Sequence, residues 1–121
     1  MLEIKTELDK AEAQSYLTAH GISTGLDRLL VMCARDAGVL MGVGAVDICP
    51  GQASLAEVCC DDADLDYGMG KALLNLVDLG GIQEVICKNE KLFALAKRLG
   101  FRPDADGVMR LNLAGYFTSH C

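Results

Sequence analysis

The sequence predicts an α/β (α+β) fold: a mixed, mostly antiparallel sheet with helices on both faces. Three β-rich runs in the first half are separated by turn residues, which predicts an antiparallel meander. From Ala53 to Leu99, strand-like and helix-like segments alternate, which predicts a parallel strand pair with helices packed on the sheet. Short apolar segments near the C-terminus predict closing strands.

The N-terminal half contains one helical pattern among the strands. Asp9 followed by Glu12 resembles a capping box, and predicts a helix over Lys10 to His20 that Gly21 ends. Asp36-Ala37-Gly38 and Pro50-Gly51 are turn signals between the strands of the meander. The strands predicted in this half are Leu2 to Thr6, Leu29 to Arg35, Val39 to Cys49 and Ala53 to Cys60.

A glycine pair, Gly68 and Gly70, predicts a turn that opens the second helix, which Gly80-Gly81 would end. Such a turn exposes unpaired backbone N–H groups, and together with the helix dipole these favour an anion such as a pyrophosphate. The remaining elements predicted are a strand over Glu84 to Lys88, a helix from Asn89 to Leu99, and closing strands at Phe101 and over Val108 to Tyr116.

The composition of the chain indicates which classes of protein and partner to expect. The 121 residues are 51% hydrophobic and 23% charged, which predicts one globular domain over residues 1–121. The net charge is −6 without a Lys/Arg stripe, so we expect neither a nucleic-acid partner nor a membrane partner. No apolar run has transmembrane length, and the charged start Met1 to Lys5 lacks a signal-peptide pattern, which predicts a cytoplasmic protein.

The six cysteines predict reduced core thiols rather than a metal site or disulfides. None forms a Cys-x-x-Cys pair, and adjacent Cys59 and Cys60 would point to opposite faces of a strand. His120-Cys121 is a metal-ligand pair at the end of the chain, but a frayed tail is the simpler interpretation. We therefore expect no metal.

The segment from Ser54 to Pro103 resembles the GNAT superfamily, the GCN5-related N-acetyltransferases. The family's Gln/Arg-x-x-Gly-x-Gly/Ala turn corresponds to Leu65 to Gly70, and its Asn-led helix ending in Gly-Phe corresponds to Asn89 to Phe101. The order of segments also resembles the acetyltransferase-like domain at the front of the citrate lyase ligases. The nucleotide-transfer domain of those ligases has no counterpart here, so no ligase activity is carried over.

The resemblance implies an acyl-CoA-dependent N-acyltransferase, with acetyl-CoA as donor and a small-molecule amine or a protein amino group as acceptor. The β-strand backbone would pair with the pantetheine amides. Amides of the glycine turn would cradle the diphosphate, and Asn89 would hydrogen-bond the pantetheine arm. The cofactor-binding residues implied in this way are Val58, Cys59, Cys60, Asp66, Tyr67, Gly68, Met69, Gly70, Lys71 and Asn89.

The sequence departs from the family pattern in three ways. Leu65 stands where the family has Gln or Arg, and Ala96 stands where it often has a Tyr general acid. Four carboxylates precede or enter the glycine turn and have the wrong sign for a diphosphate: Asp61, Asp62, Asp64 and Asp66. These departures leave open a second interpretation, a degenerate CoA-binding or regulatory module with little catalysis.

Glu57, near the end of the third meander strand, is the candidate catalytic residue. Beside the cofactor it would act as general base toward an ammonium acceptor; alternatively it is a charged residue on the exposed face of its strand. The N-terminal region has one helix where the family usually has two, so the acceptor side would be open or completed by a second subunit. A possible homodimer would pair the final strand, Val108 to Phe117.

Overall fold

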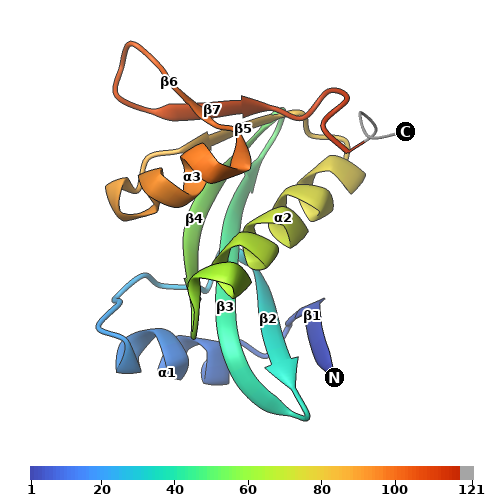
Figure 1. The fold of residues 1–121 in the computed structure, drawn as a ribbon, viewed down its shortest axis with the longest axis vertical. Coiled ribbons are helices and arrows are strands. Elements are labelled where there is room, and N and C mark those ends of the chain that lie inside the picture. The colour runs from blue at the N-terminus through green and yellow to red at the C-terminus, as the bar shows by residue number, and fades with distance from the viewer. Residues whose placement is uncertain (118–121) are drawn as a thin grey trace.

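A seven-stranded sheet in the order β1-β2-β3-β4-β5-β7-β6 runs through the computed structural model, which describes residues 1–117 (Figure 1). Neighbouring strands are antiparallel except for β4 and β5, which are parallel. The strands are β1 Leu2–Thr6, β2 Leu30–Asp36, β3 Val39–Cys49, β4 Gln52–Cys60, β5 Glu84–Cys87, β6 Arg102–Pro103 and β7 Met109–Asn112. The helices are α1 Ala11–Ala19, α2 Ala63–Leu79, the 3-10 turn η1 Glu90–Leu92 and α3 Phe93–Leu99.

The two faces of the sheet carry separate cores, because alternate residues of a strand point to opposite faces. In β2, Val31 and Cys33 pack with the buried face of α1, whereas Met32 and Ala34 pack with α2 and α3. The longest helix, α2, crosses β3 and β4 with α3 beside it (Figure 1). The predicted mixed, mostly antiparallel sheet with helices on both faces is therefore confirmed.

The N-terminal half follows the sequence-based prediction within one or two residues. The Asp9 carboxylate accepts a hydrogen bond from the Ala11 N–H at 3.2 Å, at the start of α1. Glu12 does not complete a capping box; it pairs with Arg35 of β2 at 2.7 Å. The five cysteines among residues 1–117 are free thiols, as predicted. His120 and Cys121 lie outside the described residues.

The start of α2 differs from the prediction. The helix begins at Ala63 rather than at the glycine pair, so Gly68 and Gly70 lie in its interior. The physical reason is the N-cap Asp62, whose backbone is extended and whose carboxylate accepts a hydrogen bond from the Leu65 N–H at 2.8 Å. The expected glycine turn at a helix N-terminus is therefore wrong.

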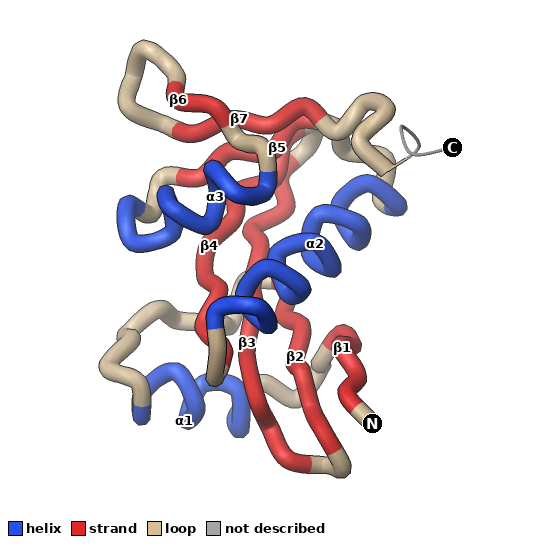
Figure 2. The backbone as a smooth tube through the Cα atoms, viewed as in Figure 1, coloured by secondary structure: helices blue, strands red, loops and turns tan. Residues whose placement is uncertain are grey.

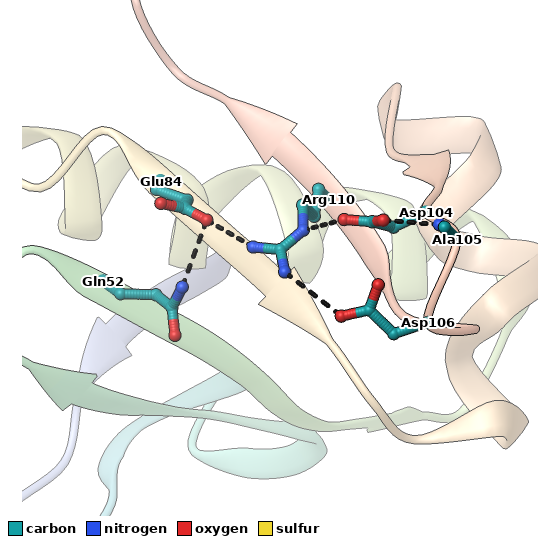
Figure 3. A network of polar contacts seen from close by, with 6 residues as sticks. All are labelled: Gln52, Glu84, Asp104, Ala105, Asp106 and Arg110. Atoms are coloured by element: carbon teal, nitrogen blue, oxygen red, sulfur yellow. Dashed lines mark hydrogen bonds and ion pairs between the residues drawn. The ribbon is translucent and has the colours of Figure 1, made fainter.

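The C-terminal end of the sheet is held by one arginine (Figure 3). Arg110 of β7 forms ion pairs with Glu84 of β5 and with Asp104 and Asp106 in the turn that precedes β7. Gln52 of β4 donates a hydrogen bond to the same Glu84 at 3.1 Å. The closing strand is shorter than predicted, Met109–Asn112, and lies between β5 and β6 rather than at the sheet edge.

Candidate functional site

Strands β4 and β5 separate partway along their length. Their parallel pairing covers only Gln52 to Ser54 of β4, against Glu84 to Ile86 of β5, although β4 continues to Cys60. The register between β3 and β4 also shifts at this point, because Leu55 pairs with Val46 and Glu57 pairs with Ala45. Ala56 is thus the extra residue of a β-bulge, a feature that often re-aims side chains beside active sites. No pattern in the sequence predicts this bulge.

Beyond Ser54, the side of β4 that faces away from β3 has no partner strand, and side chains occupy its backbone groups instead. Asn89 donates from Nδ2 to the carbonyl oxygen of Ala56 at 3.2 Å. The N–H of Val58 donates to Glu57 Oε1 at 3.3 Å, and the N–H of Cys60 donates to Asp66 Oδ1 at 2.9 Å. This strand edge is therefore polar and ready to pair with an extended amide-bearing ligand that displaces the side chains.

Glu57 is buried at this edge. Its residue is 4% exposed, so the alternative of a charged residue on an exposed face is wrong. The Glu57 carboxylate accepts a hydrogen bond from Thr24 Oγ1 at 3.1 Å through Oε2 and the long contact from Val58 through Oε1. A buried carboxylate at the edge of a strand separation has the position that a general base needs.

The thiols near the separation are poor nucleophiles. Burial raises the pKa of Cys87 and of Cys59, and nearby carboxylates, including Glu57, raise both further. Burial also raises the pKa of the Cys60 thiol, with Asp66 adding to the effect. A thiol must ionise to attack a carbonyl carbon, so the local charges oppose a covalent role for these cysteines.

The N-terminus of α2 is already satisfied by the chain itself. Asp62 caps the Leu65 N–H, and the Asp66 N–H donates to the Asp62 carbonyl at 3.1 Å. The N–H groups from Asp66 to Lys71 are in helix interior, where they bond to carbonyls four residues earlier. The predicted diphosphate cradle therefore lacks free backbone amides; its residues were Asp66, Tyr67, Gly68, Met69, Gly70 and Lys71. The free amides at the start of α2 are instead those of the exposed Ala63 and Asp64.

The two glycines of the predicted turn lie in different surroundings. A Cβ at Gly70 would stand 2.7 Å from a methyl carbon of Leu99, so Gly70 allows α2 and α3 to pack closely. A Cβ at Gly68 would meet nothing within 4 Å. Gly68 lines a groove of about 610 Å³ together with Leu2 of β1 and Met41 of β3, on the other side of α2 from Leu99.

Positive charge reaches the start of α2 from an unexpected residue. The Arg98 guanidinium of α3 lies 5.0 Å from the centre of the Tyr67 ring, and its Nη1 donates to the Ala63 carbonyl at 3.4 Å. Lys71 points elsewhere: its ammonium lies 4.4 Å from the centre of the Tyr116 ring. Arg98 lies in the last turn of α3, where a cation suits the helix dipole. Its contact across two helices had no local pattern that could reveal it.

The other two departures from the family pattern are core residues. Leu65 is 7% exposed and Ala96 is fully buried, and both belong to the core beneath α2 and α3. An arginine at position 65 would have to bury its charge or displace the first turn of α2. The loss of the family's polar groups at these positions is thus accommodated by apolar packing.

Burial raises the pKa of the Asp66 carboxyl above its usual value, and hydrogen bonds from Cys60 oppose that shift. Burial also raises the pKa of Tyr16 of α1, and its hydrogen bond to Asp61 raises it further. Tyr16 donates to Asp61 Oδ1 at 2.6 Å, at the end of β4. Carboxylates thus surround the start of α2, with Arg98 as the nearby cation.

Comparison with solved structures gives the fold. The ribosomal-protein-S18-alanine N-acetyltransferase of Escherichia coli superposes with a TM-score of 0.67 and 16% identity, over 93% of this chain and 94% of that one. A GNAT family acetyltransferase of Elizabethkingia anophelis with acetyl-CoA bound gives 0.68 and 7%, over 93% and 98%. N-acetylglutamate synthase of Neisseria gonorrhoeae, complexed with coenzyme A and N-acetyl-glutamate, gives 0.76 and 10%, over 93% of this chain and 35% of that one.

No protein-family model and no curated protein matches the sequence. At these identities the likeness is one of fold, and the chain has the GNAT fold. The closer resemblance to the citrate lyase ligase domain is not supported by these comparisons. Within residues 1–117, none of the helices has the length and apolar character needed to cross a membrane.

Proposed function

We propose that the protein is an acyl-CoA-dependent N-acyltransferase, a single domain over residues 1–121 that transfers acetyl from acetyl-CoA to an amine. The observation that carries the proposal is the free edge of β4 beyond Ser54, with the buried Glu57 carboxylate beside it. Solved structures with this fold contain coenzyme A or acetyl-CoA. The edge offers alternating N–H and C=O groups that suit the amides of a pantetheine arm.

The thioester supplies an activated acyl group when acyl-CoA is bound. The backbone of Val58, Cys59 and Cys60 binds the pantetheine arm, and Asn89 releases Ala56 to join this pairing. The Val58 N–H then lies where it stabilises the carbonyl oxygen during attack. Glu57 takes one proton from the acceptor ammonium, directly or through one water. The neutral amine attacks the thioester carbonyl and the C–S bond breaks. The second nitrogen proton passes through water to the departing CoA thiolate, because Ala96 supplies no acid. The acceptor is a small-molecule amine or a protein amino group that enters from the α1 face of the sheet.

We propose that the diphosphate binds at the start of α2 rather than at the glycine pair. The Ala63 and Asp64 amides and the Arg98 guanidinium are the donors there. Asp62 and Asp66 oppose an anion at the same place, each held by a backbone N–H of the chain. We therefore expect weak CoA binding. Salt should weaken it further, because the attraction between the diphosphate and the Arg98 guanidinium is partly screened by dissolved ions.

A second candidate function rests on that same acidic turn. A degenerate module that keeps the fold but binds CoA poorly, or serves regulation, is favoured by the self-capped N-terminus of α2. Calorimetry with acetyl-CoA and CoA, followed by thiol release with a panel of amines, separates the two. Binding with thiol release supports the transferase, and binding without release supports the module. No heat at millimolar CoA overturns the acyl-CoA proposal.

Two further expectations from the sequence stay predictions: a cytoplasmic location and a homodimer. The first two residues of β7, Met109 and Arg110, already pair with β6. A dimer formed by β7 would therefore have to displace β6. Light scattering of the full chain at several concentrations tests whether a dimer forms by any surface.

A further inference from the structure

The segment between α1 and β2, residues 20–29, lies in the N-terminal region, where the GNAT family usually has two helices and this chain has one (Figure 2). Side chains of α1 hold it in place. Gln14 donates from Nε2 to the Thr24 carbonyl at 2.9 Å, and its Oε1 accepts from the Leu26 N–H at 3.1 Å. Lys10 donates to the Leu29 carbonyl at 2.6 Å. Although it lacks regular structure, the segment is held at Thr24 and on its C-terminal side, and Leu26 is fully buried.

Thr24 is the residue of this segment that reaches the candidate base. Its hydroxyl donates to Glu57 Oε2 at 3.1 Å, while Glu57 Oε1 faces the Val58 N–H at 3.3 Å. The two oxygens are thus held from opposite directions, one by the α1 side of the molecule and one by the strand edge. No Lys or Arg forms an ion pair with Glu57 within residues 1–117.

We propose that Thr24 is a positioning residue for Glu57, and that Gln14 sets Thr24 for this role. The inference rests on the proposed function. A carboxylate that is 4% exposed without a paired cation depends on hydrogen-bond donors to hold one orientation. The Thr24 hydroxyl is therefore the donor that keeps the Glu57 carboxylate aimed.

The test compares Thr24→Val with Thr24→Ser in the full chain. Valine removes the hydroxyl at nearly constant volume, so kcat should fall about tenfold while KM for acetyl-CoA stays unchanged. Serine should restore kcat. Ser23→Ala, an exposed neighbour, is the control and should leave kcat and KM unchanged.

Two further measurements keep the outcome decisive. Gln14→Leu removes the two hydrogen bonds that Gln14 makes to the segment and should lower kcat in the same way without touching Glu57. The carbon-13 signal of the Glu57 carboxyl at neutral pH should shift in Thr24→Val, which loses the hydrogen bond, and return in Thr24→Ser. An unchanged carboxyl signal in a folded Thr24→Val variant, or a loss of kcat that serine fails to reverse, overturns the inference.

The carboxyl signal also separates this inference from the proposed function. If the wild-type protein releases no thiol with any amine, the transferase proposal fails. The carboxyl signal still reports whether Thr24 holds Glu57, because it needs neither acyl-CoA nor an acceptor.

Discussion

The two halves of the candidate CoA site are built differently. Along β4, the backbone edge is open beyond Ser54, and single side chains from Asn89 and Glu57 cover its polar groups. At the start of α2, Asp62 already accepts from the Leu65 N–H, and Asp66 adds a carboxylate that accepts from Cys60 at the end of β4. The first half matches what the fold would need for pantetheine, and the second half opposes the diphosphate that should follow it.

The difference separates the parts of a site that the backbone fold determines from the parts that depend on individual side chains. The separation of β4 from β5 comes from strand pairing and a bulge, which are features of the backbone. The donors at a helix start depend on single side chains, and one aspartate at the N-cap is enough to move the helix start and occupy one of its N–H groups. Substitutions at the two halves should therefore have separable effects.

The largest effect is expected at the strand half. Glu57→Gln keeps a buried, hydrogen-bonding side chain but removes the base, so kcat should fall about 10²- to 10⁴-fold. The Kd for CoA should stay within a factor of about two, since the change affects proton transfer rather than the strand edge. Single-turnover acetyl transfer and calorimetry measure the two quantities. Glu90→Gln, an exposed carboxylate, is the control, and equal losses in both variants would remove Glu57 from the mechanism.

Substitutions of Gly68 and Gly70 should have the next largest effect. They separate a role of these glycines in helix packing from a role in phosphate binding. Gly70→Val should cost about 1–3 kcal/mol of unfolding free energy, because its side chain overlaps Leu99. Gly68→Ala should instead stabilise α2 by up to about 1 kcal/mol, since it fills open space in a helix interior. Urea unfolding measures both. If Gly68→Ala abolished CoA binding at unchanged stability, the glycine would border the diphosphate, as its sequence pattern suggests.

The glycines also show how far the sequence could predict the molecule. Alternating apolar residues and turn signals located the strands, and Asn89 with Gly100 located the start and end of the last helical segment. The start of α2 was misplaced because a Gly-x-Gly pattern was taken as a turn, although Asp62, with Leu65 three residues later, is an N-cap signal. Contacts such as Arg98 with Tyr67 or Thr24 with Glu57 join distant segments and leave no periodic trace in a sequence.

Arg98→Ala tests whether the helix half contributes to binding at all. Arg98 is the cation at the start of α2, so its loss should weaken CoA binding about tenfold at low salt and less at high salt. Lys97→Ala removes an adjacent exposed charge on the same helix and is the control. Calorimetric titrations at two salt concentrations measure the effect. Equal weakening in both variants would indicate general electrostatics rather than a contact at this turn.

The smallest expected effect is a gain, at the residue where the two halves meet. Asp66 occupies the last N–H of the β4 edge and places a carboxylate at the start of α2. Asp66→Asn keeps an acceptor for Cys60 but removes the charge, so CoA binding at neutral pH should tighten a few-fold. Asp64→Asn, an exposed change of equal charge, separates this effect from simple neutralisation. A CoA affinity unchanged by Asp66→Asn, or changed equally by both variants, would show that the edge of β4 and the start of α2 do not act as one site.

The same variant has a pH signature in stability. Burial raises the pKa of Asp66 in the folded protein, so the ionised form is disfavoured by folding. Wild type therefore loses the corresponding stability as pH rises through that raised pKa, whereas Asp66→Asn does not. The melting temperature of Asp66→Asn should exceed that of wild type at neutral pH. The gap should close as pH falls below the usual range of an aspartate, where the carboxyl is protonated in both the folded and the unfolded chain. Thermal unfolding of both proteins across this pH range measures the gap. A gap that widened on acidification would mean that the Cys60 hydrogen bonds, rather than burial, dominate the energetics of Asp66.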